Sequence, residues 1–281
     1  MIRRRAFLSW LPLALASPRL LAAETRVRFG MTPAFLHDQH GLLADWRQYM
    51  EKRIGRRVEF VQRDSYRETM DLLRLEKIDF AWICDYPYVH LRKVVRLLAV
   101  PIYGGKPHYQ AYLIVPASDV HTAELRQLKG RVFAYADPYS NTGYLAPRFQ
   151  LKQQAEDPAQ FFGKTFFTYS HRKLIDAVAS GLAHGASVDS YVWDTLNRLK
   201  PEVTRRTRIV ERSPAYGFPP LVAHRSVGQP LFLEMQQMLL SMKNDPEGQA
   251  LLARLNLDGF GIEQDALYDP VAEMMRAFGE V

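Results

Sequence analysis

The amino-acid sequence predicts an α/β protein of two doubly wound lobes with a ligand cleft between them. From Arg26 onward, short runs of strand type alternate with segments whose apolar residues recur at helical spacing. The run 78–84 is apolar except for Asp79, which is typical of a strand buried on both faces of a parallel sheet. A length of 281 residues with 47% hydrophobic residues is sufficient for two hydrophobic cores.

The first 23 residues are predicted to be an export signal peptide. A basic start, Arg3–Arg5, precedes an apolar stretch from Phe7 to Ala16, and small residues follow up to Ala23. The stretch is too short and too interrupted by proline to span a bilayer. Segment 4–8 resembles the twin-arginine export pattern, and an ordinary Sec signal is an equal alternative. We therefore expect the mature chain to begin near Glu24, in the periplasm.

Charge and cysteine content exclude several classes of protein. Four of the 37 Lys and Arg residues lie in the signal segment, which has no Asp or Glu, so more than half of the formal net charge of +7 belongs to it. The rest of the chain has no basic tract of the kind that binds nucleic acid and no later apolar run of about 18 residues for membrane insertion. Cys84 is the only cysteine and is not beside the cleavage site, so neither an internal disulfide nor a lipid anchor is expected.

The first lobe is predicted to begin with three strand–helix units. Its strands and helices alternate in the order strand 27–30, helix 42–54, strand 58–61, helix 65–75, strand 78–84 and a helix from 87. Gly55 is a stop signal for the first helix, and Ser65 with Glu68 forms a capping box at the start of the second. Pro87 suits the first turn of the third helix. Repeated units of this kind predict a largely parallel sheet.

The same alternation restarts in the middle of the chain and defines a second lobe. The further predicted elements are strands 97–103 and 109–115, then strands 132–136, 166–168 and 186–189 with helices from 141, over 174–182 and up to 199, and finally helices 231–242 and 248–255. The chain is expected to cross between lobes near Val115 and again between 214 and 219. We therefore assign 24–115 plus 216–281 to lobe 1 and 116–215 to lobe 2.

The strongest candidate site is the junction 137–144, which directly follows a predicted strand. In doubly wound sheets, ligands bind beyond the carboxyl ends of the strands, where helix N-termini present unpaired N–H groups. The hydroxyls of Ser140 and Thr142, with the N–H groups of Asn141, Thr142 and Gly143, would converge on one point at a helix start. This arrangement predicts a site for a tetrahedral anion. The alternative is that Ser140 or Asn141 only caps a helix.

Other predicted strands also end in polar or reactive side chains. They are Thr32 after the first strand, Cys84, Asp85, Tyr86 and Tyr88 after the third, His171 after strand 166–168, and Asp189 at the end of strand 186–189. His171 and Asp189 would lie beside an anion held at the first junction. The alternatives are a satisfied surface or core histidine and, for Cys84, a small buried apolar residue.

Enzyme chemistry and metal binding find little support. The sequence has no Gly-x-Ser-x-Gly elbow, no Gly-rich phosphate loop and no Cys-x-x-Cys pair. His37 and His40 have the spacing of metal ligands, but without a third ligand we interpret them as part of an exposed loop. We therefore expect no catalytic residues, no metal and no cofactor.

Taken in order, several motifs resemble a known family. They are Asp137-Pro138-x-Ser140-x-Thr142-Gly143-Tyr144-Leu145-x-Pro147-Arg148, Phe161-Phe162, Ser170-His171, Val188-Asp189-Ser190, Ser213-Pro214 and Pro219-Pro220. This set resembles the phosphonate/phosphite/phosphate-binding component of ABC transporters over nearly the whole mature chain. The resemblance implies a type II periplasmic binding protein whose two lobes close on the ligand like a hinge.

The resemblance also implies roles for individual residues. The family's oxyanion cradle falls on Ser140, Asn141 and Thr142, and its histidine falls on His171 as a further donor. Its cleft tyrosine falls on Tyr88, with Tyr86 as the competitor, and its acid that meets a ligand amine falls on Asp189. Two departures stand out: Asn141 replaces a hydroxyl or small residue, and Cys84-Asp85 stands where relatives have a small residue such as Gly. The charge of Asp85 so close to an anion puts an alkylphosphonate ligand in doubt.

The function expected from these residues is the capture of a small phosphonate-, phosphite- or phosphate-type oxyanion for an ABC permease in the inner membrane. The alternative is an oxyanion sensor that signals to a membrane histidine kinase. In that alternative, the Cys84 thiol would bind arsenite, because trivalent arsenic favours sulfur as soft metal ions do. A third possibility, an enzyme using the same cleft, lacks a positioned general base or metal in the sequence.

Overall fold

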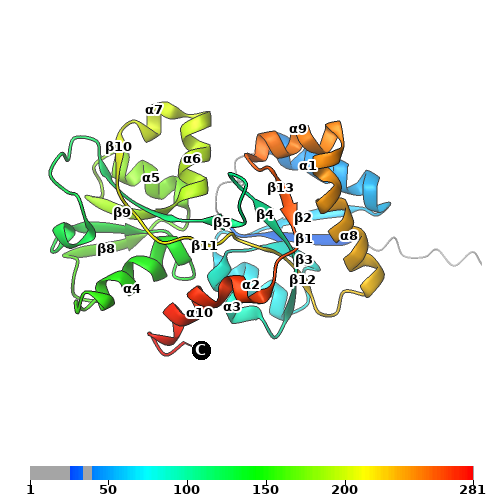
Figure 1. Cartoon of the computed structure of the whole chain (residues 1–281), viewed down its shortest axis with the longest axis horizontal. Coiled ribbons are helices and arrows are strands. Elements are labelled where there is room, and N and C mark those ends of the chain that lie inside the picture. Colours follow the sequence, from blue (N-terminus) through cyan, green and yellow to red (C-terminus); the bar gives the residue numbers. More distant parts are fainter. Residues whose placement is uncertain (1–25, 34–39, 281) are drawn as a thin grey trace, which may run out of the picture.

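The computed structural model describes residues 26–33 and 40–280, and it has two α/β lobes side by side, joined by a pair of short strands (Figure 1). The predicted fold class is therefore confirmed. The predicted export signal lies outside the described residues. In the described part of the chain, no helix combines the length and the apolar character needed to cross a membrane.

The first lobe is built on a six-stranded sheet with the order β13-β4-β12-β3-β1-β2. Its strands are β1 (Val27–Met31), β2 (Val58–Gln62), β3 (Phe80–Trp82), β4 (Val95–Ile102), β12 (Leu221–His224) and β13 (Gly259–Gly261). Its helices are α1 (His40–Ile54), α2 (Tyr66–Arg74), α3 (Asp85–Leu91), α8 (Gln229–Ser241), α9 (Pro246–Leu255) and α10 (Asp269–Arg276), with the short turns η4 (Met242–Asn244) and η5 (Asp265–Tyr268). Strands β1, β2 and β3 are parallel, whereas β12 and β13 run antiparallel to their neighbours.

The apolar face of α1 fixes this helix on the sheet. Trp46 is fully buried, and its ring lies 5.8 Å from that of Phe29 of β1 in an edge-to-face arrangement. Such aromatic pairs stabilise beyond the area that they bury. The capping box predicted for α2 is present, because Ser65 accepts from the Glu68 N–H and the Glu68 carboxylate accepts from the Ser65 N–H.

The second lobe is built on a five-stranded sheet with the order β10-β6-β9-β7-β8. Its strands are β6 (Ala111–Pro116), β7 (Val132–Tyr135), β8 (Lys164–Phe167), β9 (Gly185–Asp189) and β10 (Thr207–Arg212). Its helices are η2 (Leu125–Leu128), η3 (Asn141–Leu145), α4 (Ala146–Gln153), α5 (His171–Ala179), α6 (Ser190–Leu199) and α7 (Pro201–Thr204). Strands β7, β8 and β9 are parallel, so the ends of β7 and β9 and the start of α5 meet at one edge of the sheet.

Two short strands, β5 (His108–Tyr109) and β11 (Tyr216–Gly217), pair antiparallel where the chain crosses between lobes. The run 109–115, predicted as one strand, is divided at Gln110, whose N–H is bound by the Ser190 hydroxyl rather than by a neighbouring strand. Strand β6 therefore starts the second sheet at Ala111, a few residues before the crossover predicted near Val115.

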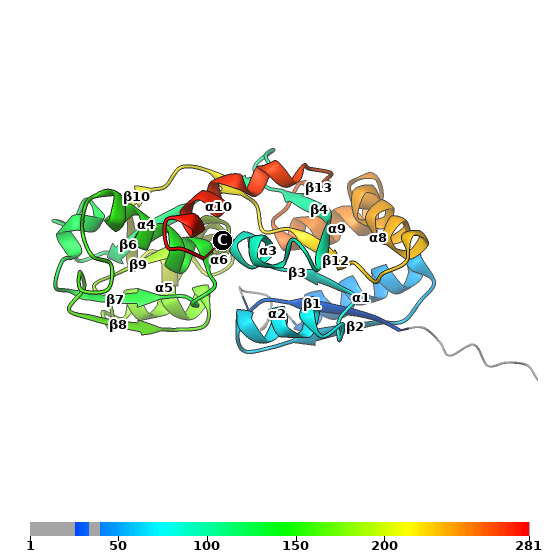
Figure 2. The ribbon, with the colours of Figure 1, turned by 90° about the horizontal axis from the view of Figure 1, so that it is seen from below.

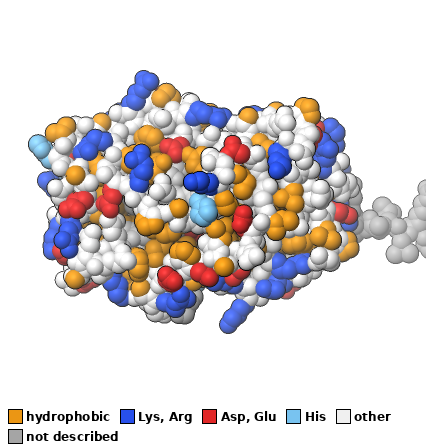
Figure 3. All heavy atoms as spheres, viewed as in Figure 1, with side chains coloured by type: hydrophobic (Ala, Val, Ile, Leu, Met, Phe, Trp, Pro, Cys, Tyr) orange, Lys and Arg blue, Asp and Glu red, His pale blue; other side chains and the backbone are white. Residues whose placement is uncertain are grey.

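The lobes also touch away from these strands. The Tyr191 hydroxyl of α6 donates to the carbonyl oxygen of Leu255 at the end of α9, at 2.5 Å, and Arg198 of α6 donates to Asn256 Oδ1 at 2.8 Å. On another face, α10 contacts both α3 and η3, and Figure 2 shows it lying across the junction of the lobes. Lys and Arg side chains are spread over the face in Figure 3 and mixed with Asp and Glu, without a basic patch on that face.

Candidate anion-binding site

The turn predicted as the anion cradle connects β7 to α4 and has an unusual backbone. Residues Asn141–Leu145 form one turn of π-helix with Ser140 as N-cap, and the Leu145 N–H donates to the Ser140 carbonyl at 3.0 Å. Single π-turns are frequent at functional sites, because they change the direction of the first groups of a helix. The side chains of Ser140, Asn141 and Thr142 are all fully buried. The three predicted cradle residues therefore lie together in the interior.

Close packing holds this turn in place. A Cβ on Gly143 would lie 2.4 Å from the Ala136 Cβ and 2.9 Å from His171 Cε1, so only glycine fits between the end of β7 and α5. The Ser187 hydroxyl of β9 donates to the Thr142 carbonyl oxygen at 2.6 Å. The turn is thus supported by two neighbouring elements of the second lobe.

His171, the first residue of α5, is buried beside the turn and acts on Ser140. Its Nδ1 accepts from the Asp189 N–H at 3.2 Å, so the proton of the neutral ring is on Nε2. Burial lowers the pKa of His171 to about 3, which keeps the ring neutral. The Nε2–H then donates to Ser140 Oγ at 3.1 Å. Both ring nitrogens are used within the protein, whereas the sequence predicted a donor to the anion itself.

Only the hydroxyl hydrogen of Ser140 remains available for a further hydrogen bond. Its Oγ accepts from the Gly143 N–H at 3.0 Å and from His171 Nε2 at 3.1 Å. A hydroxyl has two acceptor positions and one hydrogen. With both acceptor positions taken, the Ser140 hydroxyl acts as a donor.

Asp85 reaches the turn from the first lobe. Asn141 Nδ2 donates to its Oδ2 at 2.7 Å, and its Oδ1 accepts from the Tyr109 hydroxyl at 2.8 Å, the Tyr86 N–H at 2.9 Å and the Cys84 thiol at 3.0 Å. Burial raises the pKa of Asp85 to about 6 in spite of these donors. The charge that cast doubt on an alkylphosphonate ligand is therefore compensated by donors from both lobes and from the crossing strand β5.

Asp189 lies near Asp85, and its pKa is raised in the same way. It is buried at the start of α6, where its Oδ1 accepts from the Val192 N–H at 3.2 Å. Burial, together with the smaller contributions of the Asp85 and Asp194 charges, raises the pKa of Asp189 to about 7. Strongly perturbed acids in the interior between two lobes are typical of functional sites.

Tyr66 and Tyr109 belong to this site although the sequence analysis did not select them. The Tyr66 N–H of lobe 1 donates to Asp137 Oδ2 of lobe 2 at 3.1 Å. Burial raises the pKa of the Tyr66 phenol, and the neighbouring acidic groups of Cys84, Asp137, Asp189 and Asp85 raise it as well, so its hydroxyl lies within electrostatic range of them. A signal for Tyr66 was available in the sequence, because it directly follows Ser65, the first residue of the capping box at the junction after β2.

The other predicted residues lie at the margin of the site. Tyr88 turns its hydroxyl to Asp265 and packs against the Tyr268 ring at 4.7 Å. Tyr86 donates its hydroxyl to Glu280, so only its backbone reaches Asp85. Thr32 is half-buried and its N–H donates to the Trp82 carbonyl at 3.2 Å.

Cys84 is buried at the centre of the site. Its Sγ lies 3.0 Å from Asp85 Oδ1 and 3.8 Å from the Tyr109 hydroxyl. Burial and the neighbouring Asp85 carboxylate raise the pKa of the thiol well above its usual value. The thiol is therefore protonated at neutral pH and serves as a donor to Asp85.

Two polar atoms of the turn are buried without a hydrogen-bond partner among the described residues. They are Asn141 Oδ1 and Thr142 Oγ1. A buried polar atom without a partner costs about 1–3 kcal/mol, so most such atoms in proteins are paired. The turn thus holds groups that a bound ligand would satisfy. Residues 26–33 and 40–280 contain no cluster of three or more His, Cys, Asp or Glu arranged for a metal ion, and His37 lies outside this part.

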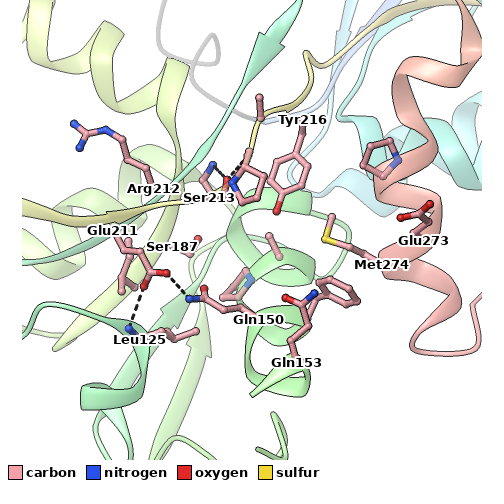
Figure 4. Close-up of a pocket in the computed structure, with 18 residues that line it drawn as sticks. Leu125, Gln150, Gln153, Ser187, Glu211, Arg212, Ser213, Tyr216, Glu273 and Met274 are labelled. Carbon is pink, nitrogen blue, oxygen red and sulfur yellow. Dashed lines mark hydrogen bonds between the residues drawn. The ribbon is translucent and has the colours of Figure 1, made fainter. Parts of the chain in front are cut away.

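A cavity of about 450 Å³ lies between α4, α10 and the segment before β11 (Figure 4). Ser187, which supports the turn, also lines this cavity. The Glu211 carboxylate on its wall accepts from Gln150 Nε2 at 2.5 Å and from the Leu125 N–H at 3.2 Å, so both of its oxygens are engaged within the protein.

Comparison with known sequences relates the chain to transport proteins. The profile of a family described as "ABC transporter, phosphonate, periplasmic substrate-binding protein" matches residues 29–268. The phosphonates-binding periplasmic protein of Escherichia coli K12 is 24% identical over 261 residues, covering 89% of this chain and 76% of that protein. A phosphate-import protein of Mycolicibacterium smegmatis is 27% identical over 158 residues, or 52% of this chain and 48% of that protein.

Solved structures share the two-lobed fold. A binding protein component of an ABC phosphonate transporter from Pseudomonas aeruginosa superposes with a TM-score of 0.82 at 21% identity, covering 89% of this chain and 85% of that one. A Prochlorococcus marinus protein, solved in complex with methylphosphonate, superposes with a TM-score of 0.83 at 18% identity, covering 91% of this chain and 99% of that one.

Proposed function

The chain belongs to the family of periplasmic substrate-binding components of phosphonate ABC transporters, and from this premise we propose that the turn Ser140–Thr142 is the cradle of its phosphorus oxyanion. The ligand would lie between the lobes and be held by the Ser140 hydroxyl, the Thr142 hydroxyl and the first N–H groups of the π-turn. Hydrogen bonds to an ionised acceptor are about twice as strong as neutral ones, and the positive end of the helix dipole adds to them.

The observation that carries this proposal is the buried, unpartnered hydroxyl of Thr142 in the turn. Thr142 Oγ1 is fully buried next to a serine whose hydroxyl is already oriented as a donor. An oxyanion would supply the acceptor that both hydroxyls need. His171 would hold the Ser140 hydroxyl in that orientation and would not itself contact the anion.

We further propose that Asp189 binds the remainder of the ligand. An ammonium group near this carboxylate would favour its charged form and compensate for its burial. The ligand class that fits an anion cradle beside a buried acid is an aminoalkylphosphonate. Tyr66 would line the same space, because its buried hydroxyl is within electrostatic range of Cys84, Asp85 and Asp189.

Transport by this protein would begin with export and end at a permease. The family works in the periplasm, and we propose that a signal peptide of residues 1–23 directs the chain there and is cleaved before Glu24. Lobe closure on the ligand would then create the form that the ABC permease of the inner membrane receives, with no bond made or broken. Mass spectrometry of the periplasmic protein tests the cleavage position.

Calorimetric titration with methylphosphonate, phosphite and phosphate tests the cradle. Thr142→Ala should weaken binding of the preferred ligand at least about tenfold, because it removes one charge-assisted hydrogen bond. Thr165→Ala is the matched control, since Thr165 is exposed on β8 of the same lobe. Unchanged affinity in Thr142→Ala, at an unchanged melting temperature, would refute the proposed cradle.

The sensor alternative depends on Cys84. Its described side-chain hydrogen bonds are to Asp85 and Tyr109, and neither favours arsenite binding over transport. The alternative remains a prediction, and a titration of wild type and Cys84→Ser with arsenite tests it.

A further inference from the structure

The orientation of the Asn141 carboxamide is fixed by its hydrogen bond to the Asp85 carboxylate. Its Nδ2 lies 2.7 Å from Asp85 Oδ2 and 3.4 Å from the Tyr109 hydroxyl. A carboxylate oxygen accepts hydrogen bonds and cannot donate them, so the NH₂ end must face Asp85. The other end, Oδ1, is then an acceptor, and it is buried without a partner.

The turn therefore presents a defined order of hydrogen-bonding groups. Ser140 is a donor, because both acceptor positions of its oxygen are taken by Gly143 and His171. Asn141 Oδ1 is an acceptor. The Thr142 hydroxyl can rotate to act as either.

This order distinguishes ligands by whether they carry a proton. A fully deprotonated oxyanion has only acceptor oxygens, and one of them placed against Asn141 Oδ1 would leave two acceptors facing each other with no hydrogen between them. An oxyanion with one O–H group satisfies Oδ1 through that hydrogen and still accepts from Ser140. Sites that bind a substrate hydroxyl reject analogues without it, because their own polar group is then left unpaired.

We propose that Asn141, oriented by Asp85, makes the site selective for singly protonated phosphorus oxyanions over sulfonates and sulfate of the same shape. The inference rests on the proposed cradle and adds the protonation state and class of its ligand. Asp85 is the positioning residue, and Asn141 is the residue that contacts the ligand. Neither role follows from the resemblance to the family, because both residues are departures from its pattern.

Asn141 and Asp85 together also make the selectivity depend on pH. Burial raises the pKa of Asp85 to about 6, so below that pH the carboxyl is protonated and can donate to Asn141 Oδ1 once the amide rotates. The NH₂ end would then face the ligand, and a fully deprotonated oxyanion would be accepted. The titratable groups around Asp85 are Asp189, Cys84, Tyr66, Tyr109, Tyr216 and Tyr268. Of these only Asp189, with a pKa of about 7, changes charge in the same range.

Methylphosphonate and methanesulfonate form the discriminating pair of probes. As a monoanion, methylphosphonate has the charge and approximate shape of methanesulfonate and differs by one hydroxyl hydrogen. Titrating the mature wild-type protein with both, above and below the pKa of Asp85, gives the ratio of the two dissociation constants at each pH. Below the second pKa of methylphosphonate both ligands are monoanions, and in this range a general change in the charge of the site, including that of Asp189, cancels in the ratio.

We expect methanesulfonate to bind at least about tenfold more weakly than methylphosphonate above pH 6, and the ratio to fall toward one below it. In Asp85→Asn the ratio should be near one at every pH at which both ligands are monoanions, since the new amide can donate to Asn141 Oδ1. Asp265→Asn, which changes the partner of Tyr88 outside the site, should keep the wild-type ratio.

Equal affinities in the wild type above pH 6, or a wild-type ratio in folded Asp85→Asn, would overturn the inference and leave the cradle in place. If Asp85→Asn does not fold, Asn141→Ala answers the same question, because it removes the acceptor and should also bring the ratio toward one; a retained ratio would overturn the inference. Failure of the proposed function has a different result: neither ligand binds the wild type at any pH.

Discussion

Ser140 Oγ lies 3.1 Å from Nε2 of His171, and this contact joins the end of β7 to the start of α5 in the second lobe. The imidazole is held from its other side by the Asp189 N–H. Three strand ends are thus connected through one neutral ring. The ring sets the direction of the hydroxyl that we propose for ligand binding.

The stability of the protein should depend on pH through His171. Burial lowers its pKa in the folded state from 6.5 to about 3, so between these values the unfolded chain binds the proton and the folded protein does not. The contribution of this ring to stability is therefore present above pH 6.5 and is lost as the pH falls toward 3. In urea denaturation, the stability advantage of wild type over His171→Gln should shrink on acidification. An advantage that stays constant over this range would contradict a buried neutral ring.

Gly143→Ala should disrupt the turn. The added methyl would lie 2.4 Å from the Ala136 Cβ, a distance that requires the backbone to shift. Overpacking of this kind costs about 1–3 kcal/mol, and the displaced N–H groups should also reduce oxyanion affinity. Gly41→Ala is the control, because its position in α1 is open and alanine favours a helix. The control should be slightly stabilised, and a Gly143→Ala protein that melts and binds like wild type would show that the turn tolerates displacement.

Substitution of two tyrosines should show which of them contributes to ligand binding. Tyr66→Phe removes a buried hydroxyl within electrostatic range of Cys84, Asp85, Asp137 and Asp189, and we expect weaker binding of the phosphorus oxyanion by about fivefold or more. Tyr88→Phe removes a hydroxyl bound to Asp265, so affinity should remain within about twofold of wild type. Calorimetry on both variants checks this. The reverse order of effects would favour Tyr88 as the cleft tyrosine.

The cradle could be predicted from the sequence because its parts are local. Ser140, Thr142 and Gly143 follow one strand directly, and a strand–helix junction restricts where their groups point. His171 and Asp189 could be added because parallel strands end at the same edge of a sheet. In the structure His171 contacts both Ser140 and the Asp189 N–H, and their role in binding stays a prediction.

The contacts between lobes could not be predicted in this way. Asp85 meets Asn141 although 56 residues separate them, and this depends on how two separate sheets face each other. Tyr88 illustrates a related difficulty: on α3 it lies three residues after Asp85, and the direction of its side chain is decided by Asp265 and Tyr268, far along the chain. Strands β10, β12 and β13 were not predicted, because short antiparallel strands leave little periodic signal.

The contact between α6 and the end of α9 is a place where the energy of the closed form can change without a change at the ligand site. Any separation of the lobes at this point must break the bonds from Tyr191 and Arg198 to Leu255 and Asn256. A substitution there would change the energy of every closed complex by the same amount, whatever the bound molecule. Overall affinity could therefore change during evolution while the preference among ligands, which we propose is decided at the cradle, stayed constant.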